Sequence, residues 1–233
     1  MNWTLITGSS LNLGAKTAIS LAEQGHHVLI HYNKSVEQAE AVANRCRKFG
    51  VRAELIQGDF SMQEGVEAFI CHLLCNFPDV KTLINNVGNY LHKSALETSQ
   101  KEWQEIFQLN LFTPIALTRA LIPSIKQSKG SIINIGTAGI SLKAHSVNTA
   151  YMAAKTSLLL FTKTLAKELA PSQVTVNMVS PGQLETSVVE VKNIPMGREA
   201  EFKDVTSVIL FLLQQSSHYL TGQNIEVAGG LCL

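Results

Sequence analysis

Residues 3–32 read WTLITGSSLNLGAKTAISLAEQGHHVLIHY and have the length of one strand–helix–strand unit. The apolar run from Trp3 to Thr7 predicts a strand, Ala15 to Gln24 an amphipathic helix, and Val28 to Tyr32 a second strand. A helical crossover of this size joins parallel strands, because a hairpin needs only a short turn. The unit therefore predicts an α/β protein built on a parallel sheet.

The turn between the first strand and its helix, Gly8 to Gly14, has features of a phosphate-binding turn. Gly8 allows the chain to leave the strand sharply, and Gly14 allows the helix to pack close to the sheet. The free N–H groups at the helix N-terminus then suit a pyrophosphate. A plain strand–helix turn without a ligand is the alternative interpretation.

The same alternation of strands and helices continues to the C-terminus. Pro114 and Pro123 are expected to interrupt or end one of the helices, that at 100–125. Linkers, repeats and low-complexity tracts are absent from the sequence, so residues 1–233 are expected to form one doubly wound domain of about seven parallel strands. The further strands are predicted at 52–57, 81–85, 130–135, 173–179 and 224–227, and the helices at 36–49, 63–76, 100–125, 150–169 and 201–213.

Composition argues against several classes of function. Hydrophobic residues make up 45% of the 233 residues, and the formal net charge of +1 gives no reason to expect nucleic acid or a membrane as a partner. The N-terminus passes directly into a strand and no run of ~18 apolar residues occurs, so we expect a cytoplasmic protein. Neither the histidines nor the cysteines have metal-ligand spacing. Buried thiols in a reducing compartment are expected at Cys46, Cys71, Cys75 and Cys232.

The residues after the second strand bear on the choice of cofactor. An acidic residue there would bind the adenosine ribose hydroxyls of NAD, but this chain has Asn33, Lys34 and Ser35 instead. All three can donate hydrogen bonds to a 2′-phosphate, so we expect NADP(H) to be favoured over NAD(H). Ser35 can also cap the following helix.

Polar and small residues also end the third and fourth strands. Asp59, which Phe60 follows, can accept a hydrogen bond from an adenine amino group or cap the next helix. Asn86 and Gly88 leave space for a ligand where the fourth strand ends. That position is the crevice of a doubly wound sheet, where ligands bind.

Tyr151 and Lys155 are four residues apart on a predicted helix and therefore lie on the same face. An ammonium at ~4 Å could lower the pKa of the phenol by up to about 3 units. A phenol tuned in this way can act as the general acid in the reduction of a carbonyl. Two ordinary residues on a helix are the alternative interpretation.

Taken in order, these motifs resemble the short-chain dehydrogenase/reductase family over essentially the whole chain. The resemblance implies a Rossmann-like sheet of seven strands, a nicotinamide cofactor and a homotetramer. The residues that carry it are Thr7-Gly8 with Gly14, Asn85-Asn86-Val87-Gly88, Asn110, Tyr151 with Lys155, Pro181-Gly182 and Thr221-Gly222-Gln223.

The same resemblance implies roles for individual residues. Tyr151 would be the general acid and base, Lys155 would bind the nicotinamide ribose, and Asn110 would hold a water in a proton relay. Asn86 and Gly88 would line the adenosine ribose. Together with the residues identified above, the expected cofactor contacts are Gly8, Ser10, Asn12, Leu13, Gly14, His31, Asn33, Lys34, Ser35, Asp59, Phe60, Asn86, Gly88, Tyr151, Lys155, Pro181 and Gly182.

The chain departs from the family pattern in its first turn and near its C-terminus. Asn12 replaces the third glycine, but Asn tolerates left-handed backbone angles, so the turn can form. Leu11 stands where NADP-dependent members often carry a basic residue, and Lys34 can supply that charge. Ala228 stands where an aspartate is common.

The family's catalytic serine is also replaced. Counting thirteen positions back from Tyr151 leads to Ala138, which has no hydroxyl. The end of the fifth strand instead aligns the serine with Thr137, and Ser141 is a third candidate. We favour Thr137, because strand ends fix positions whereas loops absorb insertions.

The overall pattern is most similar to 3-oxoacyl-(acyl-carrier-protein) reductases. We therefore expect reduction of a 3-oxoacyl thioester or a related ketone. Asn12-Leu13-Gly14 and residues 31–35 resemble pteridine reductases, which reduce dihydropteridines, although those enzymes carry an aspartate near Thr137. A cofactor-binding regulatory protein with impaired catalysis is a further alternative. In the family's tetramers the helices at 100–125 and 150–169 pair between chains.

Overall fold

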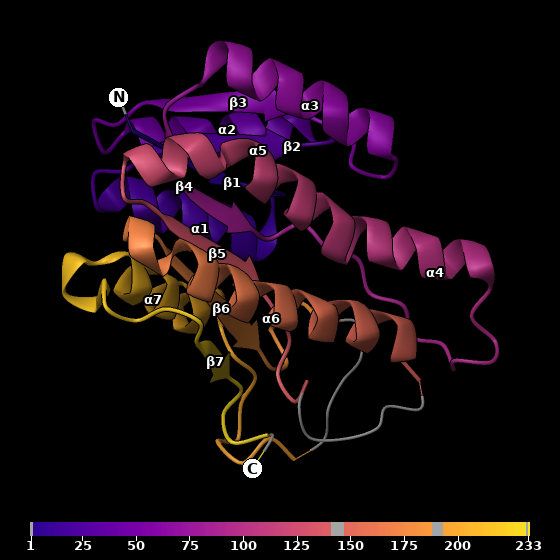
Figure 1. Cartoon of the computed structure of the whole chain (residues 1–233). Coiled ribbons are helices and arrows are strands. Elements are labelled where there is room, and N and C mark those ends of the chain that lie inside the picture. The colour runs from indigo at the N-terminus through magenta and orange to yellow at the C-terminus, as the bar shows by residue number, and fades with distance from the viewer. Residues whose placement is uncertain (1, 141–146, 188–192, 232) are drawn as a thin grey trace.

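The computed structural model describes residues 2–140, 147–187, 193–231 and 233. Its centre is one seven-stranded sheet in the order β3-β2-β1-β4-β5-β6-β7 (Figure 1), and every neighbouring pair of strands is parallel. This arrangement confirms the predicted fold class. The strands are β1 (Trp3–Ile6), β2 (His27–Tyr32), β3 (Ala53–Gln57), β4 (Val80–Asn85), β5 (Ser131–Ile135), β6 (Thr175–Pro181) and β7 (Asn224–Val227).

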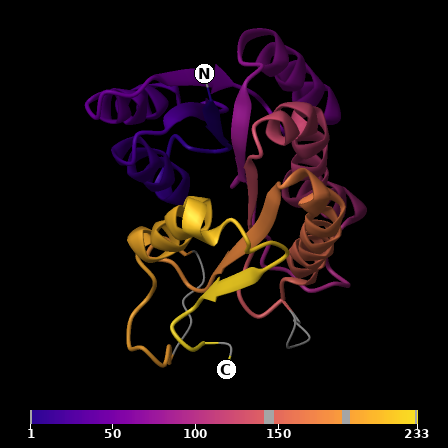
Figure 2. The same ribbon diagram turned by 60° about the vertical axis from the view of Figure 1, so that its left-hand side comes forward.

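Helices cover both faces of the sheet (Figure 2). One face carries α1 (Asn12–Glu23), α2 (Val36–Arg47) and α7 (Phe202–Leu213). The other carries α3 (Gln63–Asn76), α5 (Thr113–Gln127) and α6 (Thr149–Leu169). The remaining helical segments are α4 (Gln100–Phe107), the π-helical turn Gln108–Phe112, and the 3-10 turns Ala170–Ser172 and Gln215–Ser217.

A hydrophobic cluster on each face holds these layers together. Ile6, Ile30 and Ile84 face α1, whereas Leu5 and Leu29 face the opposite layer. Successive side chains of a strand point to opposite faces, so strands covered on both sides read as continuous apolar runs. Burial of each such aliphatic side chain contributes about 1.5–3 kcal/mol to the free energy of folding.

The direction of the crossovers reverses between β1 and β4. From β1 the chain proceeds through β2 to β3, whereas from β4 it proceeds the other way to β5, β6 and β7. The turns that leave β1 and β4 therefore diverge and open a crevice at the carboxyl edge of the sheet. This edge carries the residues singled out in the sequence.

The long helical segment α4–α5 differs from expectation at its two prolines. A π-helical turn precedes α5, and Pro114 stands in the first turn of α5, where its missing N–H is not needed. Pro123 lies inside α5, which continues to Gln127, so it does not end the helix as predicted. Within the described ranges, Gln100–Gln127 is the one segment long and apolar enough to cross a membrane by length and composition alone. Here it packs on the sheet and on α3 and α6.

The cysteines are only partly buried, which corrects the prediction. Cys46 is buried on α2, and burial raises the pKa of its thiol to about 11. Cys71 and Cys75 are exposed, because α3 turns Val66, Phe69 and Leu73 toward the core. Cys232 lies outside the described residues.

Candidate active site

A cavity of about 500 Å³ opens at the carboxyl ends of β4, β5 and β6. Asn110, Thr137, Tyr151 and Lys155, which come from three separate segments of the chain, all line it. Six further residues of this lining are among the expected cofactor contacts: Asn12, Leu13, Asn86, Gly88, Pro181 and Gly182. The structure thus brings the predicted catalytic residues together at one place.

Lys155 is buried one helical turn after Tyr151, with 4% of its surface exposed. Its Nζ donates a hydrogen bond of 2.8 Å to the carbonyl oxygen of Ile135, the last residue of β5. The same atom lies 5.7 Å from the centre of the Tyr151 ring. Burial lowers the pKa of this ammonium to about 8. The group is a desolvated cation at neutral pH, steadied by a backbone carbonyl and an aromatic face.

The pKa of Tyr151 contradicts the expectation that Lys155 would lower it. Burial raises the pKa of the phenol to about 12, and the hydrogen bond with Thr137 opposes that rise. The nearby Tyr90 phenol raises it further. The prediction failed because it counted the attraction of the ammonium but not the removal of both groups from water. In this structure Tyr151 holds its proton at neutral pH.

Thr137 is the hydroxyl that the structure places beside Tyr151. It follows the end of β5 and forms a hydrogen bond with the phenol. Ala138, the next residue, also lines the cavity. Its backbone N–H donates a hydrogen bond of 2.8 Å to the carbonyl oxygen of Pro181. Ser141, the third candidate, lies outside the described residues.

Asn110 is fully buried in the π-helical turn. Its Nδ2 donates to the side-chain and backbone oxygens of Asn89, at 2.8 and 3.0 Å, and to the carbonyl oxygen of Ile106 at 3.0 Å. Its Oδ1 has no partner within the part of the chain that the structure describes. A Cβ on Gly88 would approach this oxygen to 2.5 Å, so glycine keeps the space beside it open. A buried acceptor of this kind suits an ordered water.

A second cavity, of about 550 Å³, continues the first toward the edge of the sheet. The two share Asn12, Leu13, Asn86 and Gly88, so they form one groove over the carboxyl ends of the strands. The second cavity is bordered by the remaining expected cofactor residues, namely Gly8, Ser10, Gly14, His31, Asn33, Lys34, Ser35, Asp59 and Phe60. Every residue expected to contact the cofactor therefore lines this groove.

The turn between β1 and α1 has the shape of a pyrophosphate cradle. Asn12 adopts a left-handed backbone with φ of +50° and begins α1, three residues earlier than the sequence indicated. A Cβ on Gly14 would collide with the carbonyl oxygen of Gly8, so the turn and helix meet closely. The described structure has no side-chain cap on α1, and residues 12–15 include no acidic residue. The free N–H groups fit a phosphate ligand.

The adenosine end of the groove differs from expectation at Asp59. Its Oδ1 accepts a hydrogen bond of 2.9 Å from the N–H of Ser61, and it does not cap α3, which begins after Met62. Hydrogen bonds to Ser61 and Asn33 and the charge of Lys34 lower the pKa of this carboxyl. A carboxylate therefore stands near Lys34, which the sequence did not indicate. Ser35 occupies the N-cap position of α2, but its hydroxyl makes no capping bond among the described residues.

Tyr90 and Asn148 line the cavity beside the catalytic residues and were missed in the sequence. The Tyr90 ring meets the Tyr151 ring edge-on at 5.0 Å, and its hydroxyl accepts a hydrogen bond of 3.3 Å from Asn148 Nδ2. Tyr90 comes just after the fourth strand, so its position near the crevice was a usable signal. Asn148 precedes α6 in a loop and carries no such signal.

The sequence matches the protein family described as enoyl-(acyl carrier protein) reductase over residues 8–232. The chain belongs to the short-chain dehydrogenase/reductase family. Its 3-oxoacyl-(acyl-carrier-protein) reductase relatives include that of Aquifex aeolicus (strain VF5), 34% identical and covering 98% of this chain and 96% of the relative. That of Staphylococcus epidermidis (strain ATCC 12228 / FDA PCI 1200) is 30% identical, with 97% of each chain covered.

Solved structures of the short-chain dehydrogenase/reductase fold agree with this membership. Acetoin dehydrogenase YohF from Salmonella typhimurium superposes with a TM-score of 0.90 at 28% identity, covering 98% of this chain and 95% of its own. A blue fluorescent protein from a metagenomic library, solved in complex with NADPH, has a TM-score of 0.91 at 26% identity, with 100% and 98% covered. The fold and family expected from the sequence are therefore both confirmed.

Proposed function

We propose that this short-chain dehydrogenase/reductase uses NADP(H) to reduce the carbonyl of a 3-oxoacyl thioester or a related ketone. The observation that carries the proposal is the convergence of Tyr151, Thr137, Lys155 and Asn110 on one cavity that continues into a dinucleotide-sized groove. When bound, the dinucleotide supplies a hydride to the carbonyl carbon. The chain's own residues supply the proton and steady the oxygen.

Tyr151 acts as the general acid. Its pKa of about 12 keeps the phenol protonated at neutral pH, and that is the form a reduction requires. The Thr137 hydroxyl is aimed at the same phenol and steadies the developing negative charge on the substrate oxygen. The Lys155 ammonium contributes positive charge in a water-poor site. A water on the free Oδ1 of Asn110 returns a proton from solvent.

Several observations support NADP(H) over NAD(H). Lys34 and Ser35 border the adenosine end of the groove, and the hydroxyl of Ser35 is free of a capping bond in the described chain. A relative of 26% identity was solved with NADPH. Asp59 opposes the preference to some extent, but its hydrogen bonds to Ser61 and Asn33 hold it in place. The charge of Lys34 then balances the carboxylate.

The cavity favours a neutral substrate carbonyl. Lys155 is the one charged side chain in the lining that the structure describes, and Tyr90, Met152 and Leu184 provide apolar surface. Relatives named as 3-oxoacyl-(acyl-carrier-protein) reductases and as an acetoin dehydrogenase both handle compounds with a neutral carbonyl or hydroxyl. Thr137, where pteridine reductases carry an aspartate, makes a dihydropteridine the weaker candidate.

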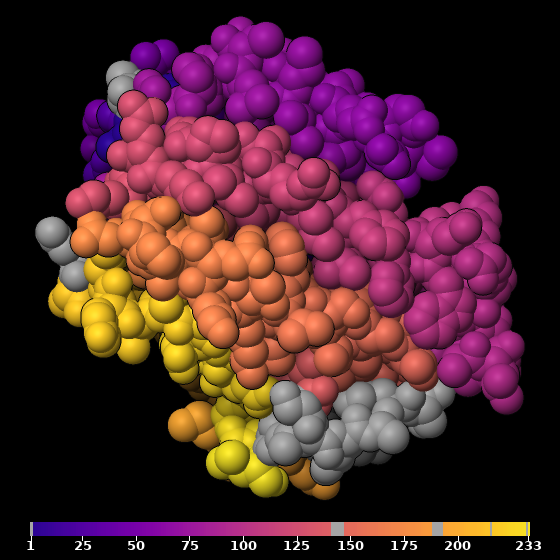
Figure 3. All heavy atoms as spheres, viewed as in Figure 1, coloured from indigo at the N-terminus to yellow at the C-terminus, as the bar shows by residue number. Residues whose placement is uncertain are grey.

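We also propose a cytoplasmic homotetramer. α5 and α6 lie side by side on one face of the molecule (Figure 3). Phe112, just before α5, and Leu160, on α6, are 51% and 68% exposed. A second copy would cover these apolar side chains. Light scattering at micromolar concentration is expected to give four times the 25.4 kDa chain mass, and a monomer mass would reject this assembly.

NADPH oxidation tests the function. The panel consists of 3-oxoacyl thioesters, simple ketones and diketones, quinones and dihydropteridines, with NADH in parallel. We expect turnover of a thioester or ketone with NADPH, and its loss in Tyr151→Phe, which removes only the phenolic hydroxyl. NADPH binding without turnover of any compound would favour the impaired, regulatory alternative. Turnover confined to dihydropteridines would favour the pteridine alternative.

A further inference from the structure

His31 is buried at the adenosine end of the groove, with 3% of its surface exposed. Its Nδ1 accepts a hydrogen bond of 2.8 Å from the backbone N–H of Gly8, in the turn after β1. Its Nε2 lies 3.1 Å from the carbonyl oxygen of Gly58, just after β3. One imidazole therefore joins the ends of two strands that lie on either side of its own strand.

These two partners determine the protonation of the ring. An N–H group at Gly8 requires an unprotonated Nδ1, and a carbonyl oxygen at Gly58 requires a proton on Nε2. His31 must therefore be neutral and in a single tautomer. Burial lowers its pKa to about 4, which agrees with this requirement.

Aromatic packing prevents the ring from turning. His31 stacks on Phe60 with ring centres 4.2 Å apart and planes within 1°, and the edge of Phe69 meets it at 5.2 Å. A turned ring would place carbon atoms against Gly8 and Gly58 and leave two backbone groups without partners. The ring has one favourable orientation.

The backbone cannot make this link itself. β1 and β3 are separated by β2, so no ladder hydrogen bond connects them. Gly8 belongs to the pyrophosphate cradle, whereas Gly58 precedes Asp59 and Phe60 on the adenine side. Backbone hydrogen bonds tie each turn separately to the end of β2, from Ser9 N–H to the carbonyl oxygen of His31 at 2.9 Å and from Gly58 N–H to that of Tyr32 at 3.0 Å. The His31 side chain adds the direct link between Gly8 and Gly58 that sets the spacing between the two parts of the groove.

We propose that His31 is a positioning residue that holds the pyrophosphate turn and the adenine wall at the separation one dinucleotide requires. The inference rests on the proposed function, since it assumes a dinucleotide in this groove. It changes the role expected from the sequence: His31 acts through Gly8 and Gly58 and does not bind the cofactor directly.

The test is a split between cofactor affinity and turnover. His31→Phe keeps the stack on Phe60 and removes both hydrogen bonds. We expect the KM and the dissociation constant for NADPH to rise about ten- to hundredfold, with kcat at saturating NADPH within about twofold of the unmodified enzyme. A control, Phe69→Leu, loosens the same aromatic cluster but leaves both hydrogen bonds, and it should leave the affinity for NADPH within about threefold.

Two conservative variants separate the two contacts. In His31→Asn the amide oxygen can replace Nδ1 as the acceptor for Gly8, and in His31→Gln the amide nitrogen can replace Nε2 as the donor to Gly58. We expect Asn to restore more of the affinity for NADPH, which spans the cradle. Gln should restore more of the affinity for adenosine 2′,5′-bisphosphate, which lacks the pyrophosphate.

The outcomes distinguish the inference from the function on which it rests. If the unmodified protein binds neither NADPH nor NADH, both fail. If it binds NADPH and His31→Phe binds equally well, only the inference fails. Nitrogen NMR gives an independent reading in the unmodified protein: a proton on Nε2 at neutral pH supports the inference, and a proton on Nδ1 overturns it. If His31→Phe does not fold, the Asn and Gln variants and the NMR reading decide.

Discussion

Lys155 at the catalytic end of the groove and His31 at the adenosine end are built alike. Each is a buried basic group whose pKa burial lowers, and each contacts a backbone carbonyl at the end of a strand, Ile135 for the lysine and Gly58 for the histidine. Lys155, with a pKa of about 8, keeps its charge at neutral pH. His31, with a pKa of about 4, does not.

The difference separates two uses of a buried base. A lysine starts from a pKa high enough that burial leaves it charged, so it supplies an electrostatic field to the reacting atoms. A histidine starts near neutrality, so the same burial makes it neutral and leaves only its directional hydrogen bonds. We therefore expect changes at the catalytic end to alter turnover, and changes at the adenosine end to alter binding or stability.

Among changes that leave Tyr151 in place, the largest effect is expected at Thr137. A hydroxyl that steadies a developing oxyanion contributes about 2.7–4 kcal/mol, so Thr137→Ala should lower turnover about a hundred- to a thousandfold while NADPH affinity stays nearly unchanged. Thr137→Ser keeps the hydroxyl and should retain most activity. Steady-state kinetics at saturating NADPH provide the measurement. A crippling Ser141→Ala together with a nearly silent Thr137→Ala would mean that the hydroxyl comes from the loop.

The next effect is the dependence of folding stability on His31 protonation. The unfolded histidine titrates near 6.5 and the folded one near 4, so between these values the unfolded chain binds more protons. Stability contributed by the neutral ring is complete above about pH 6.5 and falls as the pH drops toward 4, by about 3 kcal/mol in total. The groups that face the ring, Phe60, Phe69, Gly8 and Gly58, are uncharged, while the charged Asp59 and Lys34 border the groove nearby.

Urea denaturation at several pH values measures this dependence. Between pH 6.5 and 4, the free energy of unfolding of His31→Phe should fall by about 3 kcal/mol less than that of the unmodified protein. Other titratable groups, such as His26, whose pKa burial lowers, are common to both proteins and cancel in the difference. Parallel stability profiles would show that folding does not lower the pKa of His31.

Lys34 should have an intermediate effect on binding. Losing a partly exposed, charge-assisted contact with a 2′-phosphate costs about 1.5–3 kcal/mol, so Lys34→Ala should weaken NADPH binding about ten- to a hundredfold. Because Lys34 lies at the adenosine end, kcat at saturating NADPH should not change. A fluorescence titration is sufficient. Unchanged affinity, or tighter binding of NADH than NADPH by the unmodified protein, would remove Lys34 from the phosphate site.

The smallest effect is the decrease in kcat/KM that is expected at high pH when Lys155 loses its proton. Its charge is lost as the pH rises through about 8, so kcat/KM should fall about tenfold for each pH unit above that value. This decrease should persist in Lys34→Ala, since that residue lies at the other end of the groove. A flat kcat/KM profile up to pH 10 would contradict a role for the Lys155 charge.

The fold was predictable because its signals are local. The strands and helices follow from apolar runs and periodicity, and the chain's observed elements differ from the predicted ones mostly by a few residues at their ends. Family motifs also identified Asn110, Tyr151 and Lys155, and strand alignment identified Thr137; all four line one cavity. Asn12 adopts the left-handed backbone expected of it.

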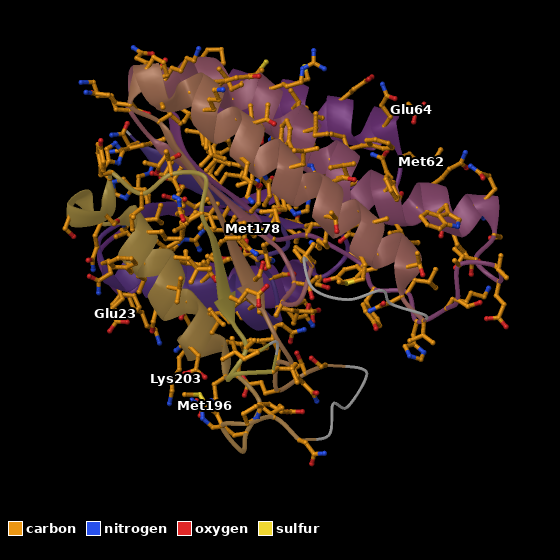
Figure 4. The ribbon with its side chains drawn as sticks, turned by 60° about the horizontal axis from the view of Figure 1, so that its bottom comes forward. Glu23, Met62, Glu64, Met178, Met196 and Lys203 are labelled. Atoms are coloured by element: carbon orange, nitrogen blue, oxygen red, sulfur yellow. The ribbon has the colours of Figure 1, made fainter. Side chains whose placement is uncertain are left out.

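The electrostatic details were not predictable, since they depend on tertiary contacts. The pKa of Tyr151 depends on how much water the fold removes, and no spacing along a helix contains that information. His31 looked like a cofactor contact because it lies at the end of an apolar strand, but its partners come from turns 23 and 27 residues away in sequence. The same limit applies to α3, which turns Cys71 and Cys75 outward, as it does Met62 and Glu64 at its start (Figure 4).

Because of the π-helical turn at Gln108–Phe112, the role of one active-site residue, Asn110, can be lost while the fold is kept. Such a turn accommodates one additional residue while the helices before and after it keep their rotational phase. Deleting a single residue there would restore a regular helix, with Ile106 and Leu117 still facing the core. Asn110 would lose the widened turn that lets it reach both Asn89 and the carbonyl of Ile106. Deletion of one codon would thus leave a folded dinucleotide-binding protein in which Asn110 no longer helps to return a proton from solvent.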